Sequence, residues 1–294
     1  MTYVTPPELA VKLIEAGESK IWMSTRDTLV RAFMAGAMLT LGAAFAVKVT
    51  VDTGQPLIGA LLFPIGFVLL YLLGYDLLTG VFVLAPLALI AKRDHVTIKG
   101  VLRNWGLTFG GNFLGALTVA ALVTIFITYG FSTSIDDAGN QFAEYGQKLA
   151  AIGHDRTLGY AEHGAGGWMA VFTRGMLCNW MVSTGVVGAM IAKDVLGKIV
   201  VMWLPVVLFF AMGFEHSVVN MFLFPVGIML GADFTWADYF LWNEIPVVLG
   251  NLVGGLLFTG AAIYLTHYKT APKRNAAAVT VDVDEDGVPV SVGY

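Results

Sequence analysis

Six long apolar segments constrain this chain more than any other feature of its sequence. A helix that crosses a membrane needs about 20 mostly apolar residues, and segments of that length recur along the chain. Only 13% of the 294 residues are charged, against about 25% in soluble domains. The sequence therefore predicts an all-α integral membrane protein with six transmembrane helices. They are expected at approximately 28–50, 57–91, 106–131, 166–192, 198–231 and 240–267.

Two of these segments are too long for a straight helix across a bilayer. At 1.5 Å per residue, a helix over 57–91 would be about 50 Å long, against a hydrocarbon core of about 30 Å. The segment 198–231 has a similar excess. Each is interrupted near its middle by a polar stretch that starts with glycine, at Gly74–Gly80 and Gly213–Asn220. We therefore expect a broken helix at both places.

One offset of 139 residues relates the two interruptions. Gly74–Asp76 and Gly213–Glu215 both read glycine, aromatic residue, acid. The same offset relates two pairs of asparagines, Asn104 with Asn243 and Asn112 with Asn251. Each half, about 28–131 and 166–267, holds three spans, and an odd number of spans makes the second half inverted. Inverted halves with paired broken helices are typical of transporters and channels, whose site lies where the breaks meet.

Positive charge is distributed unevenly over the predicted loops. Thirteen of the 17 lysines and arginines fall in the terminal segments and alternate loops, and three fall in the loops between. Because cytoplasmic loops are enriched in these residues, both termini are expected in the cytoplasm, with the protein in the inner (plasma) membrane. The predicted domains are a cytoplasmic N-terminal helix over 1–27, a pore domain over 28–268, and a disordered acidic tail over 269–294.

His216 is the most informative candidate for function. An ionisable side chain inside a hydrophobic span indicates function by default, although an inert buried histidine is the structural alternative. Imidazole exchanges a proton near neutral pH, so His216 suits a passing anion. Asn220 follows four residues later and would share its face in a helix. Thr79 supplies a hydroxyl at the other break, and the positive ends of half-helices also favour an anion.

The remaining polar residues of the spans have structural interpretations. Gly74 and Gly213 are expected to form the breaks. Asp76 and Glu215 are expected to satisfy free N–H groups at the half-helix ends, because a carboxylate facing the pathway would repel anions. Asn179 is expected to bind either another helix or a solute.

Glycines spaced four residues apart form a further pattern. Gly111 with Gly115, and Gly250 with Gly254, are pairs that allow close helix approach. They predict tight packing around the pore or against a neighbouring subunit.

Motifs of other functions are absent from the sequence. It has no zinc-protease, P-loop or serine-hydrolase motif, and its single cysteine, Cys178, provides no metal cluster. We therefore expect neither an enzyme nor a bound cofactor or metal. A neutral-solute pore of the aquaporin type would need paired Asn-Pro-Ala loops, which this sequence lacks. Without a basic stripe, nucleic acid is not an expected partner.

Four separated motifs resemble those of the formate/nitrite transporter family. They are Gly74–Thr79, Arg174–Trp180, Gly213–Met221 and Ile245–Asn251, and the resemblance extends over about 5–268. It implies an aquaporin-like fold and a homopentamer with one pore per subunit. The implied substrate is a small monovalent anion, formate first, accompanied in some members by a proton. Nitrite is the main alternative, followed by hydrosulfide or lactate.

The resemblance also implies roles for individual residues. His216 would be the central pore histidine, with Thr79 as its partner and Asn179 beside them. Two apolar constrictions would flank this centre, an outer one of Leu78 and Phe209 and a cytoplasmic one of Phe63 and Phe67. Family members usually carry an outer-vestibule lysine, which this chain lacks. His163 or Arg156 would then attract the anion.

Overall fold

The computed structural model describes residues 3–270, so the predicted acidic tail lies almost wholly outside the described part of the chain. Within that part the named elements are all helical. They are α1 (Pro6–Trp22), α2 (Thr25–Thr53), α3 (Pro56–Leu62), α4 (Pro64–Leu72), α5 (Leu78–Ile90), α6 (Ile98–Ile127), α7 (Ala143–Asp155), α8 (Leu158–Ala161), α9 (Gly164–Ile191), α10 (Val195–Ala211), α11 (Ser217–Met229), α12 (Trp236–Tyr239) and α13 (Ile245–Gly255), with the π-helical turns η1 (Phe240–Glu244), η2 (Leu256–Ala261) and η3 (Tyr264–Lys269).

The helices follow the six predicted segments. Three are long and apolar enough to cross a membrane: α2, α6 and the continuous helix Trp236–Lys269. Helix α9 is 28 residues long. The two remaining segments are chains of shorter apolar helices, α3–α4 followed by α5, and α10 followed by α11. The two predicted breaks are therefore present. A further interruption separates α3 from α4 at Pro64, whose nitrogen cannot donate a helical hydrogen bond.

Glycine conformation explains where the two main breaks begin. Gly74 has φ +73° and Gly213 has φ +64°, a left-handed conformation that a Cβ atom disfavours. No heavy atom lies within 4 Å of the place a Cβ would occupy at either residue. The backbone turn, rather than crowding, therefore requires glycine. The preceding helices end at Leu72 and Ala211, two residues before each glycine.

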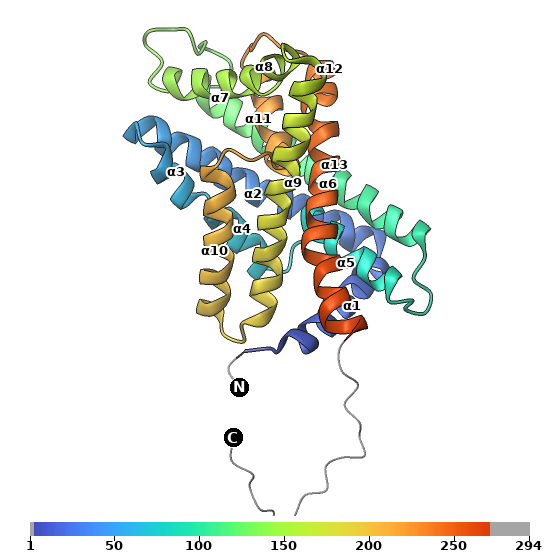
Figure 1. Ribbon diagram of the computed structural model, residues 1–294. Helices are drawn as coiled ribbons and strands as arrows, with labels where there is room; N and C mark the ends of the chain where they lie inside the picture. The colour runs from blue at the N-terminus through green and yellow to red at the C-terminus, as the bar shows by residue number, and fades with distance from the viewer. Residues whose placement is uncertain (1–2, 271–294) are drawn as a thin grey trace, which may run out of the picture.

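The two halves pack as inverted copies. Helix α2 packs against α6 as α9 packs against α13, and α1 contacts α5 as α7 contacts α11. Helix α1 lies at the end of the molecule where the described part of the chain begins and ends, whereas α7 and α8 lie at the opposite end (Figure 1). We call these two ends the α1 side and the α7 side.

Both glycine pairs lie at contacts inside one subunit. A Cβ at Gly115 would lie 2.0 Å from the Phe33 carbonyl oxygen, and one at Gly254 would lie 2.0 Å from that of Met176. The pairs therefore allow α6 to approach α2 and α13 to approach α9 at backbone distance.

We expect Gly254→Val to destabilise the protein strongly, because overpacking against an immovable backbone costs about 1–3 kcal/mol or more. Gly110→Val is the matched control on α6, where a Cβ meets nothing within 4 Å. Thermal unfolding in detergent measures the difference. Equal melting temperatures for the two variants would show that α9 and α13 do not need this contact.

Candidate functional site

His216 and Thr79 meet at the centre of the molecule, from opposite halves of the repeat. The Thr79 Oγ1 atom lies 3.3 Å from His216 Nε2, and the two residues are 0% and 2% exposed. His216 Nδ1 accepts a hydrogen bond from the Val219 N–H at 3.4 Å and so caps α11. Because Nδ1 accepts this bond, a neutral ring carries its proton on Nε2, facing Thr79.

Two cavities approach this pair from the two ends. The cavity on the α1 side has a volume of about 270 Å³, and the one on the α7 side about 210 Å³. They are inverted copies, since the 139-residue offset relates three of their lining residues. Tyr71, Leu84 and Val186 line the first, and Phe210, Leu223 and Val47 line the second.

A buried aromatic layer separates His216 from the α7-side cavity. The Phe209 ring stacks on the imidazole with 5.7 Å between centroids. Phe63 packs against Phe209 at 5.6 Å and against Phe210 at 4.0 Å. Phe63 and Phe209 are 0% and 1% exposed, so an anion leaving this cavity meets a dry, apolar barrier.

This arrangement corrects the predicted grouping of the apolar residues. Phe63 lies with Phe209, whereas Phe67 lines the α1-side cavity. Phe63 and Phe67 were expected in one constriction. They are four residues apart, which is about one helical turn, so they lie at different depths along the pathway. Leu78 is the buried first residue of α5, next to Thr79.

Asparagines from the third helix of each half cap the two breaks. Asn251 Oδ1 accepts from the Ser217 N–H at 3.0 Å, and its Nδ2 donates to the carbonyls of Gly175 and Glu215. Asn112 does the same with the Leu78 N–H and the carbonyls of Ala32 and Asp76. The repeated asparagines in the sequence therefore hold the start of each second half-helix.

Asp76 and Glu215 do not cap these helices, contrary to the sequence prediction. Lys20 Nζ lies 2.5 Å from Asp76 Oδ1, and Arg156 Nη1 lies 3.6 Å from Glu215 Oε2. The carboxyl groups are almost fully buried, and a buried charge requires a partner of this kind. Lys20 belongs to α1 and Arg156 follows α7, so equivalent elements supply the cation in both halves.

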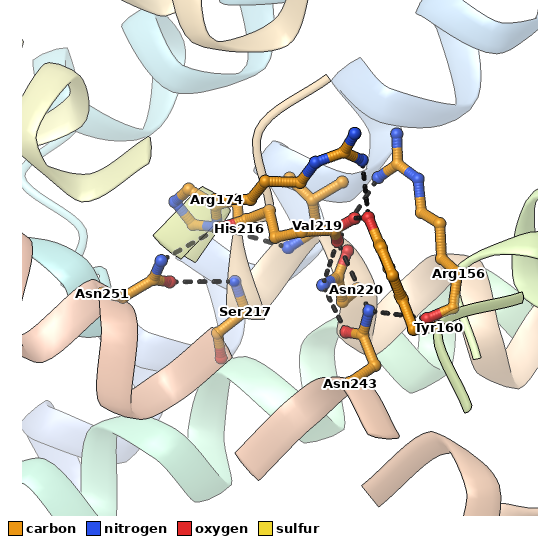
Figure 2. A network of polar contacts seen from close by, with 10 residues as sticks. Arg156, Tyr160, Arg174, His216, Ser217, Val219, Asn220, Asn243 and Asn251 are labelled. Carbon is orange, nitrogen blue, oxygen red and sulfur yellow. Dashed lines mark hydrogen bonds and ion pairs between the residues drawn. The ribbon is translucent and has the colours of Figure 1, made fainter. Parts of the chain in front are cut away.

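Glu215 belongs to a larger polar network, of which Figure 2 labels Arg156, Tyr160, Asn220 and Asn243. The Tyr160 hydroxyl donates to its Oε1 at 3.1 Å, and Asn220 donates to its Oε2 at 3.0 Å. Burial, together with Glu215, raises the pKa of Tyr160 to about 12, so this hydroxyl keeps its proton. Asn220 Nδ2 also donates to Asn243 Oδ1 at 2.6 Å. Asn220 therefore faces this network and not the His216 ring, because His216 precedes the first turn of α11.

Of the two predicted vestibule residues, Arg156 lines the α7-side cavity and His163 does not. Arg156 lines the α7-side cavity together with Lys148. His163 is exposed at the N-cap of α9 and lies outside that lining. Arg156, next to Glu215, and Lys148 therefore supply positive charge at this mouth.

Comparison with known proteins agrees with this architecture. The profile of a family described as "Formate/nitrite transporter" matches residues 7–265. The chain belongs to the formate/nitrite transporter family. It is therefore a membrane transport protein and not an enzyme.

Relatives of this family member match over nearly their whole length. This chain is 34% identical over 283 residues to a probable formate transporter of Methanothermobacter thermautotrophicus, and the match covers 91% of this chain and 98% of the relative. It is 30% identical over 275 residues to the formate channel BtFdhC of Bacillus thuringiensis, with 92% and 98% covered. A solved pentameric formate channel with formate bound has a TM-score of 0.67 and 26% identity, and the match covers 82% of this chain and 96% of that one.

Asn179 of this transporter binds helices on both sides of the central pair. Its Nδ2 donates to the carbonyls of Thr79 at 3.1 Å and Asn251 at 2.7 Å. Its Oδ1 is buried and accepts no hydrogen bond from the described residues. Of the two predicted partners, another helix or a solute, the structure shows the helix.

Several residues of the site were missed by sequence reasoning. Glu244 lies inside the predicted span 240–267, and an acid there is the same signal that marked His216. Lys20 and Tyr160 carry no such signal, because they lie outside the spans and their partners are 56 and 55 residues away. Among the described residues, no three histidines, cysteines or acids are grouped as metal ligands would be.

Proposed function

We propose that this family member transports formate, with a proton, through a pore in each subunit of a pentamer. The observation that carries the proposal is the buried Thr79–His216 pair enclosed between two inverted cavities. The names of the relatives and the solved pentameric formate channel support both the substrate and the assembly. No observation favours nitrite over formate.

The proposed mechanism follows from the polarity along the pathway. Arg156 attracts the anion into the α7-side cavity. Stripping water from an ionised carboxylate at the Phe63–Phe209 layer is costly. An anion that reaches His216 favours uptake of a proton by the ring from the solution on the side of entry, because an opposite charge stabilises the imidazolium form. Transfer of that proton to the carboxylate leaves a neutral ring and neutral formic acid, which continues to the α1-side cavity at lower cost than the ion and releases the proton there. Thr79 holds the ring edge that faces the substrate.

We further propose that the α1 side faces the cytoplasm, with both termini there and the protein in the plasma membrane. The excess of lysine and arginine in the terminal segments and alternate loops supports this orientation. In this arrangement 28–268 is the pore domain, and the N-terminal segment 1–27 covers its cytoplasmic mouth.

Flux into liposomes, with internal pH recorded, tests the proposed function. We expect formate uptake that accelerates as external pH falls and that acidifies the interior. Parallel assays with nitrite, hydrosulfide and lactate rank the substrates, and native mass spectrometry of the same sample reports the number of subunits. Absence of formate flux from correctly assembled protein would contradict the proposal.

We expect Phe209→Ala to relax selectivity, because it removes one wall of the aromatic layer beside His216. Acetate and lactate uptake should rise relative to formate uptake by at least about tenfold, since one or two methylenes are worth about 1–3 kcal/mol in an apolar site. Phe258→Ala, at a half-exposed ring on the last span, is the control. An unchanged ratio would place the size filter elsewhere.

A further inference from the structure

Glu244 is a buried carboxyl group that the proposed pathway does not use. It is 1% exposed. Its Oε1 lies 2.5 Å from Ser217 Oγ and its Oε2 lies 2.8 Å from the Tyr239 hydroxyl. Both partners are neutral hydroxyls, and the neighbouring cation Arg156 pairs with Glu215 instead. Burying a carboxyl group inside a membrane span is energetically costly, so an acid at this place indicates a functional role.

A π-helical turn brings Glu244 to the second break. Glu244 ends η1, two residues before Pro246, which cannot donate a helical hydrogen bond. A π-turn contains one residue more than an α-turn, and such turns are frequent at functional sites. As a result two consecutive side chains, Asn243 and Glu244, are both buried. The first bonds Asn220 and the second bonds Ser217, so both contact the broken segment.

The first half of the repeat has no counterpart of this contact. The 139-residue offset places Trp105 opposite Glu244 and Leu78 opposite Ser217. The asparagine cap is the same in both halves, and the first break forms without a carboxyl group at the position that corresponds to Glu244. Glu244 is therefore not required to build a break. The Glu244–Ser217 contact is present in the half that carries His216 and absent from the other half.

Ser217 connects Glu244 to the pore. Asn251 holds its backbone N–H (Figure 2), and Glu244 holds its hydroxyl. The preceding residue is His216, whose backbone is extended at φ −114°. Because these two anchors fix the residue that follows the histidine, they also fix the direction in which the imidazole faces Thr79.

We propose that Glu244 is a positioning residue for transport, which holds the His216 ring toward Thr79 by bonding the Ser217 hydroxyl. This inference rests on the proposed function for its flux measurement. The proposed positioning role requires the hydrogen bond between Glu244 and Ser217 and not a negative charge at position 244. An amide at position 244 should therefore replace the carboxyl group in part, whereas an alkyl group of similar size should not.

Flux through four variants tests the hydrogen bond. Glu244→Leu should lower the maximal formate flux at least about tenfold, because small misplacements of a reacting group have effects of this size or larger. The formate concentration at half-maximal flux should stay within about twofold, since neither cavity is lined by residue 244. Glu244→Gln should keep at least half of the flux. Ser217→Ala should lower it like Glu244→Leu, and the double variant should be no worse than either, because both changes remove the Ser217–Glu244 hydrogen bond.

Glu144→Leu on α7 is the matched control, since Glu144 is exposed and removal of its charge affects neither break. Flux is normalised to the correctly assembled oligomer. If Glu244→Gln loses as much flux as Glu244→Leu, a charge and not a hydrogen bond is required, and the proposal is wrong. If Glu244→Leu does not assemble, Ser217→Ala decides, and wild-type flux in that variant overturns the proposal.

A structure of Glu244→Leu in nanodiscs separates this inference from formate transport. We expect the Thr79 Oγ1–His216 Nε2 distance to increase beyond hydrogen-bonding range. If the wild type moves no formate but the ring turns in the variant, the proposed function fails and the positioning role stands. If the wild type moves formate and the variant retains both flux and ring orientation, the positioning role fails alone.

Discussion

His216→Phe is expected to assemble like the wild type and to lose proton-coupled formate uptake. Phenylalanine keeps a flat ring of similar size against Phe209, but it removes the donor at Nε2 and the exchangeable proton. Hydrogen bonds to charged groups are worth about 1.5–3 kcal/mol, so flux should fall about 10- to 100-fold. The α11 cap at Nδ1 is also lost, yet Asn251 still holds the start of that helix.

Formate flux at several external pH values measures this effect. Wild-type uptake should accelerate as the external pH falls, because each anion that crosses takes a proton with it, and the residual flux of the variant should lose this dependence. His267→Phe, in the last turn of the final span on the α1 side, is the matched control. A His216→Phe protein with the wild-type rate and the same pH dependence would make the histidine structural and the mechanism wrong.

Arg156→Met should cause the second large effect, because it leaves the fully buried Glu215 without its cation. Removing one partner of a fully buried pair costs about 3–5 kcal/mol, and the cost here lies at or below the low end of that range because Arg156 is partly exposed. Tyr160 and Asn220 still donate to Glu215, so we expect a loss of about 3 kcal/mol in stability. Anion flux should fall as well, since the α7-side cavity loses a positive charge.

Three further variants assign the cause of that loss. Arg156→Lys keeps the charge and should recover most of the stability. Lys148→Met removes a charge from the same cavity and should destabilise the protein far less. Adding Glu215→Gln to Arg156→Met should restore part of the stability, because the double variant no longer buries an unpaired charge. Thermal unfolding that is additive across the two changes would show that the ion pair contributes little.

Much of the fold could be predicted, because local sequence determines it. Apolar length marks the spans, and a fixed offset between two interruptions marks the inverted repeat. The left-handed glycines at 74 and 213 mark the breaks to within a few residues. Each of these signals lies within one segment or recurs at one spacing, so no knowledge of packing is needed.

The candidate site was predicted less completely, because its contacts are distant in sequence. His216 and Thr79 were identifiable as polar groups at the breaks, but their 3.3 Å contact joins residues 137 apart. The partners of Asp76 and Glu215 come from α1 and from the end of α7, outside the spans that the sequence made prominent. Capping by acids was a reasonable local inference, and it failed because asparagines from a different helix had already occupied the same N–H groups.

The grouping of phenylalanines failed for a different physical reason. Phe63 and Phe67 are four residues apart, but Phe63 immediately precedes α4 and Phe67 lies about one turn further along it. Phe63 reaches the aromatic layer beside Phe209, whereas Phe67 lines a cavity. Depth along a pore depends on where a helix begins, and here α4 begins at Pro64, a boundary that apolar length does not reveal.

The partly inverted relation of the two cavities has a consequence for the direction of transport. Three lining positions of one cavity have counterparts in the other, and a cation paired to a buried acid lies at each end. The Phe63–Phe209 layer has no aromatic counterpart, since the offset relates these residues to Met202 and Leu70. An ion that enters from the α1 side therefore meets His216 before this layer, whereas one from the α7 side meets the layer first. We expect the rates of entry from the two faces to differ, while the direction of net movement follows the combined gradient of formate and protons.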